Sequence, residues 1–327
     1  MKRKILLVVA VIVCGTTGVI IPRILNQYKK TVKEKTTVYI PLNATYAQML
    51  DSVATAVGDM ESFRKVAQSA SLETRFKPGR YVLLPDKSNK ELVRMFQMGW
   101  ETPMMLTLSG NIRGLEKLSG ILGRKLAADS AAFMEHFSAS NMWMGKVIPN
   151  TYEVYWTITP QKFTERMEKE YEKFWNEERT AKAAKIGLSR KEVSILASIV
   201  CEETNYGPDM PKVAGVYMNR LKRGMKLDAD PTVKFALGDP TIKRILFKHL
   251  EVDSPYNTYK NIGLPPGPIT IPSIKGIDAV LNYEEHNYLY FCANSNMDGT
   301  HKFARTLTEH NRNAREWQAA LNRLKIK

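Results

Sequence analysis

Cysteine is scarce in this chain. Its 327 residues include three cysteines, Cys14, Cys201 and Cys292, and no two of them form a C-x-x-C pair. This spacing excludes a cysteine-based zinc site, and nothing else in the sequence calls for a metal or another cofactor. Cys201 and Cys292 both lie in apolar runs, where a buried free thiol is the simpler interpretation. A disulfide between them stays open as the alternative in an oxidising compartment.

Acidic residues are also in short supply. Asp and Glu number 33 against 48 Lys and Arg, which gives a formal net charge of +15. Such an excess favours an anionic partner, which could be a nucleic acid, an acidic membrane surface or an acidic polymer. The chain has no zinc finger and no aromatic-rich RNA-binding signature, and its basic residues are spread along its length. We therefore do not expect nucleic acid as the partner.

One long apolar run is present, at the N-terminus. Lys2, Arg3 and Lys4 precede the segment Ile5–Pro22, whose length is near the lower limit of roughly 17 residues for a membrane-spanning helix. A cleaved signal peptide is the rival interpretation, but no small-x-small cleavage site follows. We predict a cytoplasmic N-terminus and a transmembrane anchor over residues 1–25, followed by a polar linker over residues 26–36.

The remainder of the chain mixes strand and helix patterns, with no internal repeat and no low-complexity segment. Residues 37–100 are predicted to form a small domain in the order strand, helix, helix, strand, with a further helix that begins at Ser88 and Glu91 and ends at Gly99. Residues 101–327 alternate helices with short strands and a predicted hairpin turn at Asp298-Gly299. The predicted fold class is α+β.

Two adjacent glutamates end the most apolar segment after the N-terminus, "SILASIVCEET". With a helix that advances roughly 100° per residue, Glu203 falls within the apolar arc, between Leu196 and Ile199. Glu202 falls beside Ser198 on the polar arc. We therefore predict that Glu202 is a solvated surface residue and that Glu203 points inward.

An inward carboxyl has a chemical consequence. Burial disfavours the charged form of Glu203 and raises its pKa, so the group can stay protonated near neutral pH and act as a general acid. The alternative is a structural role, in which Glu203 pairs with a buried arginine or caps a neighbouring helix.

Further candidate residues lie downstream. A second amphipathic helix ends in "NRLKRG", the stretch "LDADPTV" places two aspartates in a turn, and a loop rich in Tyr, Asn and Pro could stack on and hydrogen-bond to sugar rings. The alternatives are that this segment is an ordinary surface loop and that His301 is a packed residue with no ligand contact. The candidate substrate contacts are Asn219, Arg220, Asp230, Tyr256, Asn257, Thr258, Tyr259 and His301.

The ordered motifs "LASIVCEET", "VYMNRL", "LDADPTV", "YNTY", "GLPPGPI" and "YLYF" carry a family resemblance. Together they resemble the endolytic murein transglycosylases of the MltG/YceG type over nearly the whole chain after the apolar segment. The resemblance implies a LysM-like domain at 37–100 and a catalytic domain at 101–327. It also implies a bacterial inner-membrane protein with its catalytic domain on the periplasmic side. The family's catalytic glutamate aligns with Glu203, while Cys201 replaces its first glutamate.

The resemblance also implies a reaction. The enzyme would cut MurNAc–GlcNAc bonds within peptidoglycan strands and leave 1,6-anhydro-MurNAc ends, which would terminate growing strands. One carboxyl would suffice, because the sugar's own 6-hydroxyl is the nucleophile. Cell-wall synthases would be partners. Two alternatives stay open: a hydrolytic muramidase that uses Asp230 as second carboxylate, and a non-catalytic glycan-binding scaffold.

Overall fold

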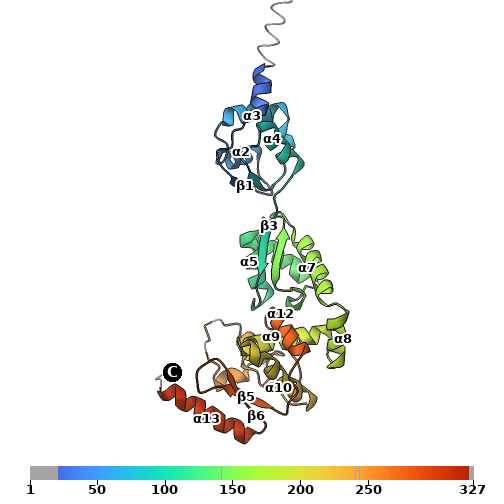
Figure 1. Ribbon diagram of the computed structural model, residues 1–327, viewed down its shortest axis with the longest axis vertical. Helices are drawn as coiled ribbons and strands as arrows, with labels where there is room; N and C mark the ends of the chain where they lie inside the picture. The colour runs from blue at the N-terminus through green and yellow to red at the C-terminus, as the bar shows by residue number, and fades with distance from the viewer. Residues whose placement is uncertain (1–20, 141, 240, 243, 324–327) are drawn as a thin grey trace, which may run out of the picture. The chain divides into compact units, whose positions relative to one another are not determined.

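The computed structural model describes residues 21–140, 142–239, 241–242 and 244–323 (Figure 1). The chain divides into two compact units. The first holds the described residues up to Leu106 together with residues 125–128 and 153–159, and the second holds the rest. Helices and short two-stranded sheets are mixed in sequence order, so the predicted α+β class is confirmed.

The first unit contains the predicted order of strand, helix, helix, strand. Strands β1 and β2 pair antiparallel with Val38 opposite Tyr81. Tyr81 and Phe96 pack edge to face at 4.9 Å in the core beneath them. The last helix begins with the predicted capping box at Ser88 and ends at Gly99, whose φ of 67° suits a residue without a side chain. The elements are β1 (Thr36–Ile40), α2 (Tyr46–Ala54), α3 (Met60–Ser69), η1 (Leu72–Thr74), β2 (Gly79–Leu83) and α4 (Asn89–Met98).

The predicted membrane localisation requires a correction. Across residues 21–140, 142–239, 241–242 and 244–323, no helix combines the length and the apolar character that a bilayer crossing demands. This finding contradicts the predicted single-pass, periplasm-facing placement in the inner membrane. The predicted apolar span falls almost entirely on residues 1–20, outside the described residues.

The elements after the first unit's helices are mostly helical. Strand β3 pairs with β4, and β5 pairs antiparallel with β6 to form the hairpin predicted around Asp298-Gly299. Helix α13 follows this hairpin (Figure 1). The elements are β3 (Met104–Leu108), α5 (Leu115–Lys125), α6 (Ser130–Ala139), η2 (Met144–Lys146), β4 (Asn150–Val154), α7 (Pro160–Phe174), α8 (Glu177–Lys185), α9 (Arg190–Glu203), η3 (Gly207–Asp209), α10 (Met210–Lys222), α11 (Asp230–Leu237), η4 (Phe247–Glu251), α12 (Ile274–Leu281), β5 (Tyr290–Ala293), β6 (His301–Ala304) and α13 (Leu307–Arg323).

Helix α9 is the central helix of the second unit. Every residue from Val193 to Cys201 is buried, including the serines that the helical phase placed on the polar arc. Ser194 Oγ donates to Arg190 O at 3.0 Å. Ser198 Oγ donates to Ile195 O at 2.7 Å and accepts from the backbone N–H of Ile269 at 3.0 Å. Because these hydroxyls are satisfied internally, the polar arc does not need solvent.

Helix α12 packs closely against α9 at Gly276. A Cβ atom built on Gly276 would lie 2.2 Å from Cys201 Sγ and 3.3 Å from Ala197 O, so only a glycine permits this approach. Cys201 Sγ lies 3.2 Å from Ser273 Oγ on the same side of α9. Cys201 and Cys292 are both free thiols, so the disulfide left open by the sequence does not form.

Candidate active site

The C-terminal end of α9 places Glu203 in a pocket of about 560 Å³. The first turn of α11, the end of α10, strands β5 and β6 and the start of α13 form the surrounding wall. Five of the residues predicted from the sequence line this pocket: Glu203, Arg220, Asp230, Tyr259 and His301. Residues that the sequence did not single out as candidates also line it, including Tyr217, Tyr290, Phe291, Cys292 and His310.

The Glu203 carboxyl has the electrostatics of a proton donor. Burial raises its pKa from the usual value to about 7. A hydrogen bond from Tyr217 Oη to Glu203 Oε1, 2.6 Å long, acts in the opposite direction, and the negative charge of Asp230 raises the pKa further. A carboxyl that titrates near neutrality can both release and recover a proton under physiological conditions.

The neighbouring carboxyl, Glu202, lies in a different environment. It forms an ion pair with Arg113, which lies two residues before the start of α5. The Glu202 side chain is 10% exposed and that of Arg113 is 41% exposed. The prediction of a solvated Glu202 is therefore wrong, because the helix end is covered by the chain around Arg113. The positive partner keeps Glu202 in a structural role.

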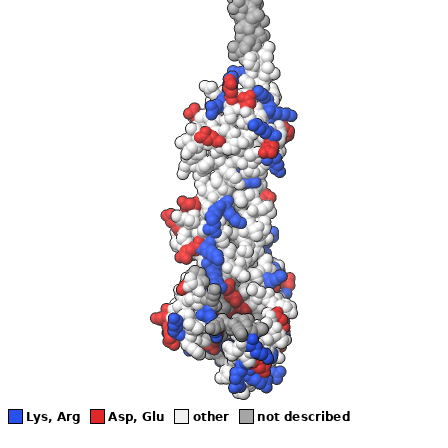
Figure 2. All heavy atoms as spheres, turned by 90° about the vertical axis from the view of Figure 1, so that its left-hand side faces the viewer, with Lys and Arg blue, Asp and Glu red and all other residues white. Residues whose placement is uncertain are grey.

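Basic side chains gather near this ion pair. Figure 2 shows a band of Lys and Arg on the face that carries α5, with acidic side chains in a hollow beside it. Lys117 and Arg124 in α5 and Arg113 before it are exposed. The positive charge therefore extends to Arg113, which pairs with Glu202, the residue next to Glu203.

The opposite wall contains a second carboxylate. Tyr259 Oη donates to Asp230 Oδ1 at 2.7 Å, and burial together with this bond raises the pKa of Tyr259. Arg220 is held beside them because its Nη1 donates to Asp228 Oδ2 at 2.9 Å and its guanidinium lies 5.1 Å from the Tyr290 ring. Asp228 has a positive φ of 47° and lies two residues before the start of α11.

Two predicted site residues support the scaffold instead of lining the pocket. Asn219 Nδ2 donates to His286 O at 2.7 Å and to Tyr288 O at 3.0 Å, which fixes the chain that leads into β5. Tyr256 packs against Phe235, with ring centroids 4.7 Å apart.

The next two predicted residues are almost completely buried. Asn257 Nδ2 donates to Leu250 O and Val252 O, each at 2.8 Å, so the amide closes its own loop. Thr258 Oγ1 accepts from the backbone N–H of Ala229 at 3.0 Å and so holds the segment before Asp230. These two residues of the loop therefore support the wall of the pocket and do not line it.

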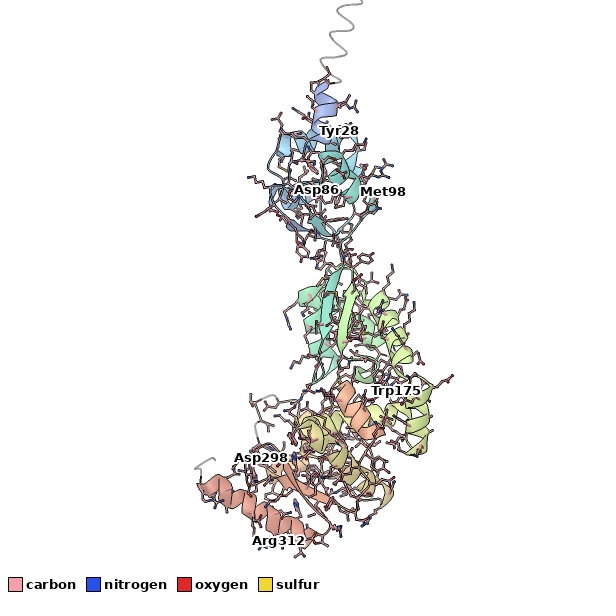
Figure 3. All side chains as sticks on the ribbon, viewed as in Figure 1. Tyr28, Asp86, Met98, Trp175, Asp298 and Arg312 are labelled. Atoms are coloured by element: carbon pink, nitrogen blue, oxygen red, sulfur yellow. The ribbon has the colours of Figure 1, made fainter. Side chains whose placement is uncertain are left out.

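Glu203 also lines a second pocket, of about 540 Å³. It is lined by the turn of the β5–β6 hairpin, with Asp298 (labelled in Figure 3), and by Tyr206 and Trp317. Three residues line both pockets: Glu203, Ala293 and His301. Glu203 thus belongs to the lining of two neighbouring concave regions.

Some of these residues were missed for a physical reason. Tyr217 is buried on the apolar side of α10, but its hydroxyl reaches Glu203. The hydroxyl of a buried tyrosine needs a hydrogen-bond partner, and this requirement was the signal that could have identified Tyr217. Asp209, directly before α10, looks like an ordinary helix-start residue, yet its carboxylate contacts His301 across the fold.

Comparison with known proteins gives a consistent result. The profile of the YceG-like family matches residues 38–316. An endolytic murein transglycosylase of Bacillus subtilis is 45% identical over 127 residues, which is 39% of this chain and 34% of that protein. One of Streptococcus pneumoniae is 34% identical over 133 residues, 39% of this chain and 24% of that protein. The chain thus matches about a third or less of the length of these curated relatives.

A solved structure is also similar. The crystal structure of a YceG-like protein from Listeria monocytogenes is 28% identical, with a TM-score of 0.54. The similarity covers 86% of this chain and 99% of that one.

Proposed function

This chain belongs to the YceG-like family, and from that premise we propose that it is a peptidoglycan lytic transglycosylase that cuts within glycan strands. The observation that carries the proposal is the Glu203 carboxyl, which has a pKa of about 7 and lines two neighbouring pockets. The curated relatives named endolytic murein transglycosylases support it.

The proposed reaction needs one acid–base group. Protonated Glu203 donates its proton to the glycosidic oxygen of a MurNAc–GlcNAc bond as the bond from C1 to that oxygen breaks. The 6-hydroxyl of the same MurNAc then attacks C1 and gives its proton to the Glu203 carboxylate. A 1,6-anhydro end forms, and Glu203 is protonated again. No water is consumed, so a second carboxylate to activate water is unnecessary.

The remaining pocket residues would bind the sugar. Asp230, Tyr259 and Arg220 supply hydrogen-bonding groups on one side of Glu203, and aromatic Tyr290 and Phe291 supply faces for sugar rings. On this proposal Asn219, Tyr256, Asn257 and Thr258 hold the wall in place. The boundaries at residues 36 and 100 and the LysM-like nature of residues 37–100 stay predictions, with glycan engagement as that unit's role. Strand termination beside cell-wall synthases is the proposed cellular context.

The second candidate is a hydrolytic muramidase. It is favoured by one observation, since Asp230 lines the same pocket as Glu203 and could activate a water molecule. Mass spectrometry of digested glycan strands separates the two reactions. We expect anhydro ends from the full chain and no product from Glu203→Gln. Reducing ends would favour the hydrolase, and no cleavage product from the full chain would favour a non-catalytic scaffold.

A further inference from the structure

His301 is held by a carboxylate that lies outside both pockets. Its Nδ1 is 3.0 Å from Asp209 Oδ2, and its backbone N–H donates to the same oxygen at 2.8 Å. The two side chains are only 11% and 13% exposed. An ionised carboxylate can only accept hydrogen bonds, so Nδ1 must carry a proton. In the neutral ring, Nε2 is then left without one.

The unprotonated nitrogen is open to the pocket. Among the described residues Nε2 of His301 has no hydrogen-bond partner, and it is not one of the two buried unpaired side-chain polar atoms, Trp175 Nε1 and His310 Nδ1. The ring packs edge to face on Phe291 at 5.6 Å, which limits its rotation. His301 also lines both pockets beside Glu203, so this acceptor lies at their junction.

A nearby histidine provides the contrast. His286 uses both of its ring nitrogens within the protein: Nε2 lies 2.9 Å from Lys212 O, and Nδ1 accepts from the backbone N–H of Tyr288 at 3.1 Å. It therefore has a purely internal role. His301 has one nitrogen fixed by the protein and one that is unused.

We propose that His301 Nε2 accepts a hydrogen bond from a hydroxyl or amide N–H of the sugar that binds beside Glu203. Asp209 is then a positioning residue that fixes the tautomer and orientation of the ring. This proposal rests on the proposed function, because it assigns a sugar contact to the same site.

Nitrogen-15 NMR of the full chain at about pH 8 tests the tautomer. We expect the His301 proton on Nδ1 in the wild-type protein and in Asp209→Asn, whose amide oxygen still accepts. In Asp209→Ala we expect a mixture of tautomers. A wild-type protein with the proton on Nε2 would overturn the assignment.

Glycan binding in the Glu203→Gln background tests the contact without turnover. The probe is purified glycan strands freed of their peptide stems. We expect His301→Ala to weaken binding about tenfold, because one hydrogen bond to the sugar is lost. His301→Gln should restore affinity to within about threefold, because its amide oxygen can reach the position of Nε2. Asp209→Ala should weaken binding and Asp209→Asn should not.

His249→Gln is the matched control, because His249 lies outside both pockets. Unchanged binding in His301→Ala would overturn the proposal while leaving the proposed function intact. If the Glu203→Gln protein binds no glycan at all, the proposed function fails, and this proposal fails with it.

Discussion

The end of α9 and the loop around Asn257 both looked like parts of a site in the sequence, and the structure gives them opposite roles. At the end of α9, Glu203 keeps a carboxyl that faces a pocket and titrates near pH 7. In the loop, Asn257 is fully buried and uses its amide to bind Leu250 O and Val252 O. A polar side chain can serve a ligand only where the protein leaves some of its bonding capacity unused.

The largest expected effect is on Glu203. Glu203→Gln keeps the size of the side chain but cannot supply a proton, so we expect glycan cleavage to fall by roughly 10³-fold or more. Release of anhydro-muropeptides measures the rate, and circular dichroism checks the fold. A folded variant that keeps a tenth of the wild-type rate would remove Glu203 from the chemistry.

A substitution in the loop should lower stability and leave the rate of cleavage nearly unchanged. Asn257→Ala leaves Leu250 O and Val252 O without their donor, and we expect the free energy of unfolding to fall by about 2–4 kcal/mol. Urea denaturation measures this change. The folded fraction should keep its rate per molecule to within about threefold.

Asn261→Ala is the matched control, because the exposed Asn261 makes the same kind of amide-to-carbonyl bonds in the same loop. We expect it to cost less than about 1 kcal/mol, since solvent can replace the lost bonds. A loss of activity in Asn257→Ala with no loss of stability would contradict the distinction drawn between the two regions.

The third effect is a pH dependence of stability. The folded pKa of Glu203, about 7, is above the ordinary value of 4.5, so the folded state holds the proton more tightly than the unfolded state. The wild-type protein should therefore lose stability relative to Glu203→Gln as the pH rises from about 4.5 to 7, by on the order of 1–3 kcal/mol. Denaturation of both proteins from pH 4 to pH 8 measures the difference. A difference that does not change with pH would argue against a raised pKa.

The smallest effect is expected at the adjacent carboxyl. Glu202→Gln removes an ion pair whose arginine is 41% exposed, so we expect less than a tenfold loss of rate and a loss of about 1 kcal/mol or less in stability. The same cleavage assay, run beside Glu203→Gln, compares the two neighbours. If Glu202→Gln abolished cleavage in a folded protein while Glu203→Gln spared it, the roles assigned at the end of α9 would be reversed.

Local signals in the sequence were sufficient for much of the fold. The capping box at Ser88 and the hairpin turn at Asp298-Gly299 were predicted because each depends on residues only a few positions apart. The charged stretch that begins at Pro160 forms two helices, α7 and α8. Trp175, labelled in Figure 3, is buried between them, and Asn176 caps the second helix.

The site was predictable only where the direction in which a side chain points from its helix decides its role. Helical phase gave the inward direction of Glu203, but it could not show that other elements cover α9 on all sides, so Glu202 was wrongly assigned to solvent. The partners of Asn219 and Asn257 are backbone carbonyls, whose positions depend on the tertiary fold. No sequence pattern encodes such partners, so supporting residues resembled binding residues.

The close approach of α12 to α9 has a consequence for how this sequence can vary. Because a Cβ on Gly276 would collide with Cys201 Sγ, positions 276 and 201 cannot change independently. A residue larger than glycine at 276 should be accepted only when position 201 becomes smaller, as in a Gly276→Ala and Cys201→Ala pair. Either of these positions could therefore shift the helix that carries Glu203 without any contact with a sugar.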